Sequence, residues 1–118
     1  MPRPIAAVLV VLVLAIAGCT SAPATGPRPV TIAVLGSSTA AGGGAGHRDS
    51  AWVARVRDHY ARTDGRVAVV NLARSGYTTF KVLPTGTPTP AGMPTVDSLH
   101  NVTAALRLRP DAILVNLP

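Results

Sequence analysis

The sequence predicts an α/β fold built on a parallel sheet. Three short uncharged stretches, rich in β-branched residues, alternate with segments whose apolar residues recur at helical spacing. This alternation is typical of strands joined by right-handed helical crossovers. Strands covered by helices on both faces lack charged residues, as these three do.

The first strand and helix are predicted from the residues that follow the N-terminal segment. Val30–Leu35 carries no charge and stops at Gly36, which favours a strand buried on both faces. Asp49 or Ser50 can then cap a helix, because a short polar side chain accepts a hydrogen bond from the first helical turn. The residues expected on the buried face of this helix are Trp52, Val53, Val56 and Tyr60.

A second strand and a long loop follow. The turn at Thr63–Gly65 leads into a further uncharged strand, Val67–Val70, which closes at Asn71. Residues 77–95 are rich in proline and glycine, which interrupt both helices and strands. We therefore expect this segment to be an irregular loop.

The last predicted elements are a helix and a third strand. Asp97 or Ser98 can cap the helix, and Pro110 stops it. The uncharged stretch Ala112–Val115 then forms the third strand. The apolar residues expected on one side of this helix are Leu99, Val102 and Leu106.

Residues 1–18 have the features of a lipoprotein signal peptide. Arg3 precedes a continuous apolar run, Ile5–Ala17, which is shorter than the roughly 20 residues of a membrane-spanning helix and leads into small residues. Ile16–Cys19 resembles the bacterial lipobox, whose cysteine thiol is acylated and becomes the new N-terminus. We expect an exported protein anchored through Cys19 to the outer face of a bacterial membrane. The alternative is a secreted protein in which Cys19 is incidental.

The remaining residues divide into a tether and one domain. Residues 19–29 lack apolar periodicity and contain several Pro and Gly, which predicts a flexible tether. Residues 30–118 suffice for one core. The net charge is +6, but the basic residues are scattered and aromatic residues are 3% of the chain. Nucleic-acid binding, which requires basic clusters and stacking platforms, is therefore not expected.

The glycine-rich segment after the first strand does not fit the known phosphate-binding patterns. The dinucleotide fingerprint requires glycine where His47 stands, and the P-loop requires a lysine that the segment lacks. The nucleophile elbow also fails, because Ala40 and Ala73 occupy positions that need glycine. What remains is a serine placed directly after a buried strand, among small residues that let a carbonyl group approach its hydroxyl.

Three stretches resemble the SGNH, or GDSL-like, hydrolases. Gly36–Thr39 (GSST) resembles block I, Asn71–Thr78 resembles block II, and Ile113–Pro118 resembles the strand that leads into block III. The resemblance covers residues 30–118. It implies a serine esterase acting on acyl or acetyl esters. It also implies a three-layer α/β/α, flavodoxin-like parallel sheet, of which this chain holds the first βαβαβ portion.

The resemblance also assigns site residues. Ser38 aligns with the nucleophile, and its N–H and that of Gly76 align with two oxyanion donors. Ser37 stands where the family signature usually has Asp, and Ser37 and Ser75 are interpreted as hydrogen-bonding loop residues. The family's third donor, an Asn, would fall just after Pro118, and its Asp-x-x-His base later still. We therefore expect an N-terminal portion that is inactive alone.

No other catalytic or metal site is expected. His59 and His100 are predicted on solvated helix faces, and His47 follows Ser38 in a loop without a residue to orient it. Histidines and carboxylates lack metal-ligand spacing, and no cofactor is expected. Asn101 begins a glycosylation sequon but is interpreted as helix surface. The expected substrate is an ester, such as an acylated carbohydrate or lipid. The alternative is a non-enzymatic surface lipoprotein that binds a carbohydrate or partner at the same strand ends.

Overall fold

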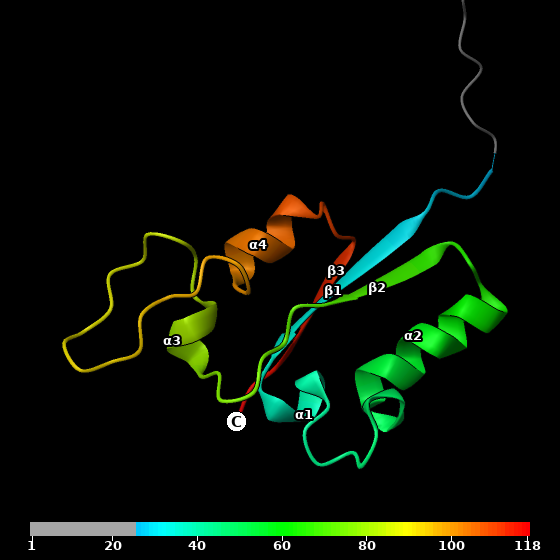
Figure 1. Ribbon diagram of the computed structural model, residues 1–118. Coiled ribbons are helices and arrows are strands. Elements are labelled where there is room, and N and C mark those ends of the chain that lie inside the picture. The colour runs from blue at the N-terminus through cyan, green and yellow to red at the C-terminus, as the bar shows by residue number, and fades with distance from the viewer. Residues whose placement is uncertain (1–25) are drawn as a thin grey trace, which may run out of the picture.

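The computed structural model describes residues 26–118, and Figure 1 shows their arrangement. The predicted signal peptide, Cys19 and most of the predicted tether lie outside the described residues. Among residues 26–118, no helix has both the length and the apolar character needed to cross a membrane.

The described chain forms an α/β structure with three strands in one sheet. The strands are all parallel and lie in the order β2-β1-β3, which confirms the predicted fold class and is consistent with part of a flavodoxin-like sheet. The elements in chain order are β1 (Val30–Gly36), α1 (Ser38–Ala41), the 3-10 turn η1 (Arg48–Ser50), α2 (Trp52–Thr63), β2 (Val67–Asn71), α3 (Thr79–Val82), α4 (Val102–Arg107) and β3 (Ala112–Asn116).

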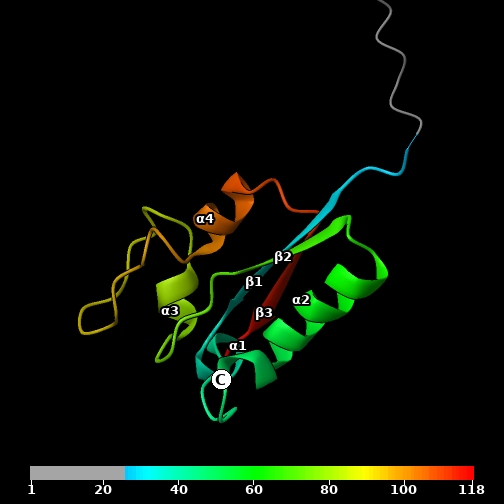
Figure 2. The same cartoon turned by 45° about the vertical axis from the view of Figure 1, so that its right-hand side comes forward.

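The central strand, β1, is buried on both faces. On one face Val34 packs with Val53 of α2, and on the other Ala33 and Leu35 pack with Ala105 of α4. Figure 1 and the turned view in Figure 2 show α2 on one side of the sheet and α3 and α4 on the other. Burial from both sides explains why β1 carries no polar side chain except Thr31 near its start.

The start of α2 differs from the prediction. Asp49 and Ser50 do not cap it, because both belong to η1, and the N-cap is Ala51, which makes no side-chain hydrogen bond. Ala51 is buried, and a Cβ added to Gly42 would lie 3.3 Å from its Cβ. The helix therefore begins at a buried residue and has no side-chain cap. The predicted face is buried or half-buried at Trp52, Val53, Val56 and Tyr60.

The segment 77–95 is mostly a loop and contains one short helix. The helix is α3, and its Val82 is buried. The chain later returns to α3, where the Asp97 N–H donates to the Lys81 carbonyl oxygen at 3.0 Å. The residues between form a loop that projects away from the sheet in Figure 1. One buried side chain thus anchors a segment whose prolines and glycines otherwise prevent regular structure.

The helix α4, which is the second of the two helices predicted from the sequence, begins about one turn later than expected. It starts at Val102, and the predicted cap Asp97 lies outside it. The Asp97 carboxylate instead accepts from the Leu99 N–H at 2.9 Å and closes a turn before the helix. The predicted face is wrong at two positions, because Leu99 is 70% exposed and Leu106 is 57% exposed.

Asn101 is the N-cap of α4 and is fully buried, so its interpretation as helix surface is wrong. Its Oδ1 accepts from the Ala104 N–H at 2.9 Å. Its Nδ2 donates to the Leu83 carbonyl oxygen at 3.0 Å and to Thr85 Oγ1 at 2.9 Å. An amide side chain can do both because it carries an acceptor and two donors. Asn101 therefore starts α4 and also ties it to the loop after α3.

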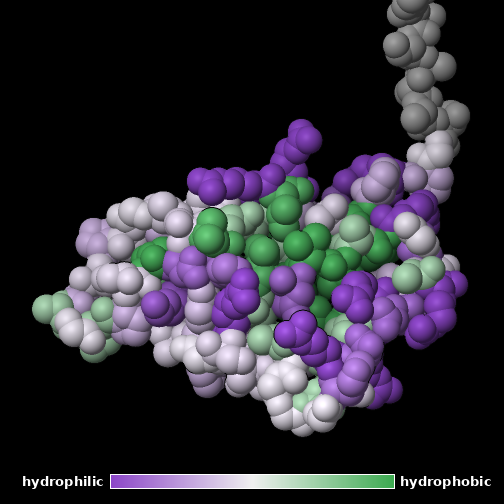
Figure 3. All heavy atoms as spheres, in the orientation of Figure 1, coloured by the Kyte–Doolittle hydropathy of each residue, from purple (hydrophilic) through white to green (hydrophobic). Residues whose placement is uncertain are grey.

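The strand β3 forms an edge of the sheet within the described residues. Leu114 is 40% exposed and Val115 is 58% exposed. Successive strand residues point to opposite faces, so both faces of β3 are poorly covered. Figure 3 shows apolar residues gathered across the middle of the molecule, between hydrophilic margins.

Candidate active site

Ser38 lies immediately beyond the carboxyl end of the central strand. It is the first residue of α1 and is exposed, whereas Ser37 before it is buried. The Ser37 N–H donates to the Asn116 carbonyl oxygen at 3.0 Å, which joins this turn to the end of β3. Neighbouring strands on both sides therefore hold the residues that lead to Ser38.

Gly36 makes this turn possible. A Cβ at this position would lie 2.6 Å from the Asn116 carbonyl oxygen and 2.7 Å from the Ala40 Cβ. Real Cβ atoms do not approach other atoms so closely, so a side chain would push β3 or α1 away. Glycine at position 36 is needed for β1 to pass between its neighbours and enter α1.

The glycines after Ser38 end the short helix and fold the chain back. Gly42 is the C-cap of α1 and adopts φ 101°, a left-handed conformation that favours glycine. The Gly43 N–H donates to the Ser38 carbonyl oxygen at 2.6 Å, and a Cβ on Gly43 would lie 3.1 Å from the Ser38 Cβ. Because these positions are glycines, no bulky side chain from this segment lies next to Ser38.

The residues after β2 continue alongside β1 toward Ser38. The Leu72 N–H donates to the Val34 carbonyl oxygen at 2.8 Å, and the Arg74 N–H donates to that of Gly36 at 3.1 Å. The Asn71 side chain adds a second tie, because its Nδ2 donates to the Ala40 carbonyl oxygen at 2.8 Å. The residues that follow β2 and the helix α1 are thus held together beyond the carboxyl ends of the strands.

Gly76 has a left-handed backbone conformation in a turn beyond the carboxyl end of β2. Its φ is 79°, and the turn is closed by the Tyr77 N–H, which donates to the Arg74 carbonyl oxygen at 3.3 Å. Within residues 26–118, the N–H groups of Gly76 and Ser38 have no hydrogen-bond acceptor. Ser75, the other serine of this turn, is exposed.

A small cavity of about 140 Å³ opens beside Ser38. Gly76 does not line it, so the two predicted oxyanion donors lie at neighbouring strand ends without sharing one cavity. The residues that line it come from the start of α1 and from the chain after β3: Ser37, Ser38, Thr39, Asn116, Leu117 and Pro118.

No histidine is hydrogen-bonded to Ser38 within the described residues. His47 accepts from the Asp49 N–H at 3.3 Å and is 3.5 Å from the Asp49 carboxylate, and its side chain is exposed. His59 is exposed on α2. Residues 26–118 also contain no group of three His, Cys, Asp or Glu side chains that could hold a metal ion.

His100 lies in a polar cluster and not on a solvated helix face, which corrects the prediction. It precedes α4, and its side chain is 19% exposed. Its Nδ1 lies 3.1 Å from the Asp97 carboxylate, and its Nε2 accepts from Arg74 Nε at 2.9 Å. His100 therefore joins Asp97, which precedes α4, to Arg74, which follows β2.

Asp97 is the centre of this cluster. It accepts hydrogen bonds from the Tyr77 hydroxyl, the Leu99 N–H and His100. The Tyr77 hydroxyl, followed by the Leu99 N–H and His100, lowers the pKa of Asp97 to about 2. Burial, together with the neighbouring Asp97 carboxylate, raises the pKa of Tyr77 to about 12.

This cluster is not predicted from the sequence, although one signal for it is present. Asp97 and His100 have Asp-x-x-His spacing, but they precede β3, whereas the resemblance places that motif after it. The hydrogen bond that His100 accepts from Arg74 could not be found from spacing, because the two residues are 26 positions apart.

No protein-family model matches the chain, and neither the comparison with curated proteins nor that with solved structures gives a match.

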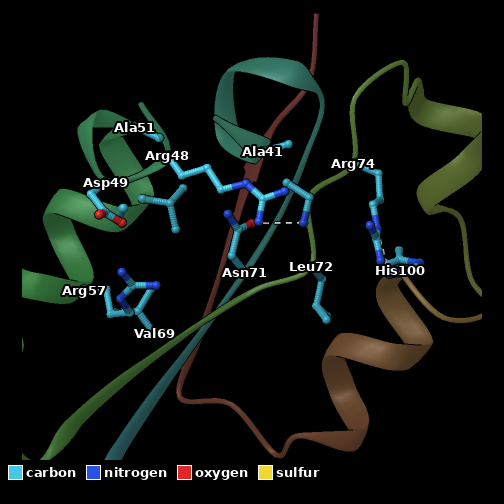
Figure 4. Close-up of a pocket in the computed structure, with 13 residues that line it drawn as sticks. Ala41, Arg48, Asp49, Ala51, Arg57, Val69, Asn71, Leu72, Arg74 and His100 are labelled. Carbon is cyan, nitrogen blue, oxygen red and sulfur yellow. Dashed lines mark hydrogen bonds between the residues drawn. The ribbon is translucent and has the colours of Figure 1, made fainter. Parts of the chain in front are cut away.

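A larger cavity of about 450 Å³ lies beside β2 and does not include Ser38. Figure 4 shows its lining, in which Arg48, Arg57 and Arg74 come from three different segments. Ala41 lines this cavity, whereas Ser38 lines the smaller one, so the single turn of α1 separates the two. We consider the smaller cavity for serine chemistry because only that one contains a serine hydroxyl beyond a central strand.

Proposed function

We propose that this chain belongs to a serine ester hydrolase of the SGNH type, with Ser38 as the nucleophile and Gly76 as an oxyanion donor. The observation that carries this proposal is the position of Ser38, which is exposed at the carboxyl end of the central strand. Ligands of open parallel sheets bind beyond the carboxyl ends of the strands. The hydrogen bonds from β2 and β3 hold this end of β1 in place.

The proposed reaction is acyl transfer through the serine. The Ser38 Oγ attacks the ester carbonyl carbon, and its proton passes to a base and then to the leaving alcohol. Water next attacks the acyl-enzyme and releases the acid. The N–H groups of Ser38 and Gly76 would stabilise the negative oxygen, and each such donor typically contributes about 2.7 to 4 kcal/mol. Ser37 cannot serve as a donor, because its N–H is bonded to Asn116.

The proposal requires a general base, since a serine hydroxyl is a weak nucleophile at neutral pH. His47 is held by Asp49, and His100 accepts from Arg74. Neither ring reaches Ser38 through a hydrogen bond in the described residues. As arranged in residues 26–118, the chain is therefore expected to have negligible esterase activity.

The nucleophile can be tested with a fluorophosphonate probe on a full-length version of the protein that also supplies the general base, because the probe reacts with a serine that a base activates. Labelling should be lost in Ser38→Ala and retained in Ser37→Ala and Ser75→Ala, which remove neighbouring hydroxyls. Labelling that persists in Ser38→Ala would contradict the assignment of the nucleophile.

We also propose that acylated Cys19 anchors the domain to the outer face of a bacterial membrane, close to ester substrates of the cell envelope. The motif at residues 16–19 supports this proposal. Replacing Cys19 with Ser should leave unprocessed precursor and abolish fatty-acid labelling, because no thiol remains to be acylated. Equal fatty-acid labelling of the two forms would rule out this anchor.

A binding lipoprotein without enzyme activity is the second candidate. The observation that favours it is the size of the cavity beside β2, which is larger than the one at Ser38. This candidate predicts that the full-length version, with Ser38 unchanged, does not react with the fluorophosphonate probe. The same labelling experiment therefore separates the two functions.

A further inference from the structure

The cavity beside β2 has the size of a small-molecule site. Its volume is about 450 Å³, within the range of roughly 300 to 1,000 Å³ that is typical of ligand pockets. Its walls are formed by η1 and the start of α2, by β2 with the residues that follow it, and by His100. Most of the surface that lines it is polar.

The charge of the lining is predominantly positive. Arg48, Arg57 and Arg74 line the cavity, and Asp49 is the one carboxylate among the lining residues. Arg57 is 3.2 Å from the Asp58 carboxylate and is therefore already paired. Two guanidinium groups, those of Arg48 and Arg74, thus remain as the principal charges toward the cavity.

These two guanidinium groups have N–H donors that are not used in hydrogen bonds within residues 26–118. The Arg48 side chain makes no hydrogen bond or ion pair within residues 26–118, and Figure 4 shows it reaching toward Asn71. Arg74 donates from Nε to Nε2 of His100, and its terminal nitrogens bond no carboxylate in the described residues. Guanidinium groups bind carboxylate and phosphate oxygens in pairs.

The wall that carries Arg74 is held in place. Its backbone N–H donates to Gly36, and its side chain rests on His100, which is held in turn by Asp97. Asn71 is not available for a ligand in the same way, because Nδ2 donates to Ala40 and Oδ1 accepts from the Ala73 N–H. The arginines are therefore the groups that would select a ligand, and they favour a negative charge.

We propose that the cavity beside β2 binds the anionic oxygen group, carboxylate or phosphate, of a small molecule such as an acidic sugar. Arg48 and Arg74, which both line this cavity, are the groups that bind it. The site does not depend on Ser38, so it holds for a hydrolase and for a binding protein alike.

The test is an NMR titration of the full chain in detergent micelles, observing the Nε–H signals of the arginines. The probes are glucuronate, inorganic phosphate and neutral methyl glucoside. The signals of Arg48 and Arg74 should shift with at least one anion and not with methyl glucoside. The anion that binds more tightly identifies the carboxylate or the phosphate as the preferred group.

Substitution of single arginines tests which of them bind the anion. Arg48→Gln and Arg74→Gln should each weaken binding at least tenfold, whereas Arg62→Gln, which removes the same charge from the exposed end of α2, should not. Arg48→Gln breaks no contact in the described residues, so it tests the site even if Arg74→Gln disturbs His100. Ser38→Ala should bind normally. Equal weakening by Arg62→Gln, equal binding of methyl glucoside, or no shift at millimolar anion would each overturn the proposal.

Discussion

At the scale of single residues, Gly36 controls how the central strand meets its neighbours. Its position between the Asn116 carbonyl oxygen and Ala40 leaves no room for a methyl group. Gly65, in the turn before β2, has open space where a Cβ would lie. Packing therefore requires glycine at position 36 but not at position 65, so Gly65 is a suitable control for a substitution at Gly36.

We predict that Gly36→Ala destabilises the protein by about 1 to 3 kcal/mol, a range typical of overpacking in a core. The inserted methyl group must displace either β3 or α1. Urea unfolding followed by circular dichroism measures the change, and Gly65→Ala is the control, expected within about 0.5 kcal/mol of wild type. Equal stability of the two variants would show that the contact at Gly36 relaxes freely.

Asp97 should make stability depend on pH in the acid range. Its pKa is lowered from 3.8 to about 2, first by the Tyr77 hydroxyl and then by the Leu99 N–H. A carboxyl whose folded pKa is depressed contributes stability above its unfolded pKa and loses it as the pH falls through the folded value. The contribution should therefore be present above about pH 4 and disappear between pH 4 and 2.

The matching experiment compares wild type with Asp97→Asn by urea unfolding at several pH values. The difference in unfolding free energy should be about 1 kcal/mol at pH 6, since the group is partly exposed, and should shrink toward pH 2. Tyr77→Phe removes the strongest of these hydrogen bonds and should reduce the acid dependence. A difference that does not change with pH would contradict the role assigned to the Asp97 charge.

At the scale of elements, the start of α4 depends on one buried side chain. Asn101 caps the helix through Ala104 and holds the loop after α3 through Leu83 and Thr85. Ser98, which the sequence also suggests as a cap, lies outside the helix and is exposed. The position of α4 is thus decided by the contact between two elements and not by the first polar residue before it.

We predict that Asn101→Ala lowers the unfolding free energy by about 2 to 4 kcal/mol. Loss of a cap costs about 1 kcal/mol, and leaving buried backbone partners unsatisfied adds a further 1 to 3 kcal/mol. Ser98→Ala is the control and should change stability by less than about 0.5 kcal/mol. If the two substitutions had similar effects, Ser98 would share in the cap and the register of α4 would need revision.

At the scale of the whole molecule, the described sheet is covered unevenly. β1 is enclosed by helices, whereas β3 exposes Leu114 and Val115 on its two faces. An uncharged edge strand offers unpaired backbone groups to other chains. Within residues 26–118, β3 has none of the lysines or bulges that usually protect such an edge.

We predict that the full chain associates through β3 as its concentration rises. Val115→Lys should reduce this association, because a charge on an edge strand opposes pairing with another sheet. Ala61→Lys, on the exposed surface of α2, adds the same charge elsewhere and should leave association unchanged. Analytical ultracentrifugation across a range of concentrations measures the effect, and equal association of the two variants would exclude β3 as the contact.

The sequence by itself determined the strands and the position of Ser38. An uncharged run rich in β-branched residues is a signal contained within a few residues, so β1, β2 and β3 lie within one residue of their predicted bounds. The order of the strands and helices along the chain also follows from local patterns. The location of Ser38 at a strand end then needs no knowledge of distant contacts.

Only the tertiary structure decided the caps, the burial of Asn101 and the cluster around Asp97. These features depend on hydrogen bonds between residues far apart in the chain, such as Asn101 with Leu83 and Arg74 with His100. Polar side chains near a helix start compete for the same local role, and the winner is the one that also satisfies a partner across the fold. The cavity beside β2 arises in the same way, because its lining residues come from segments that are far apart in the sequence.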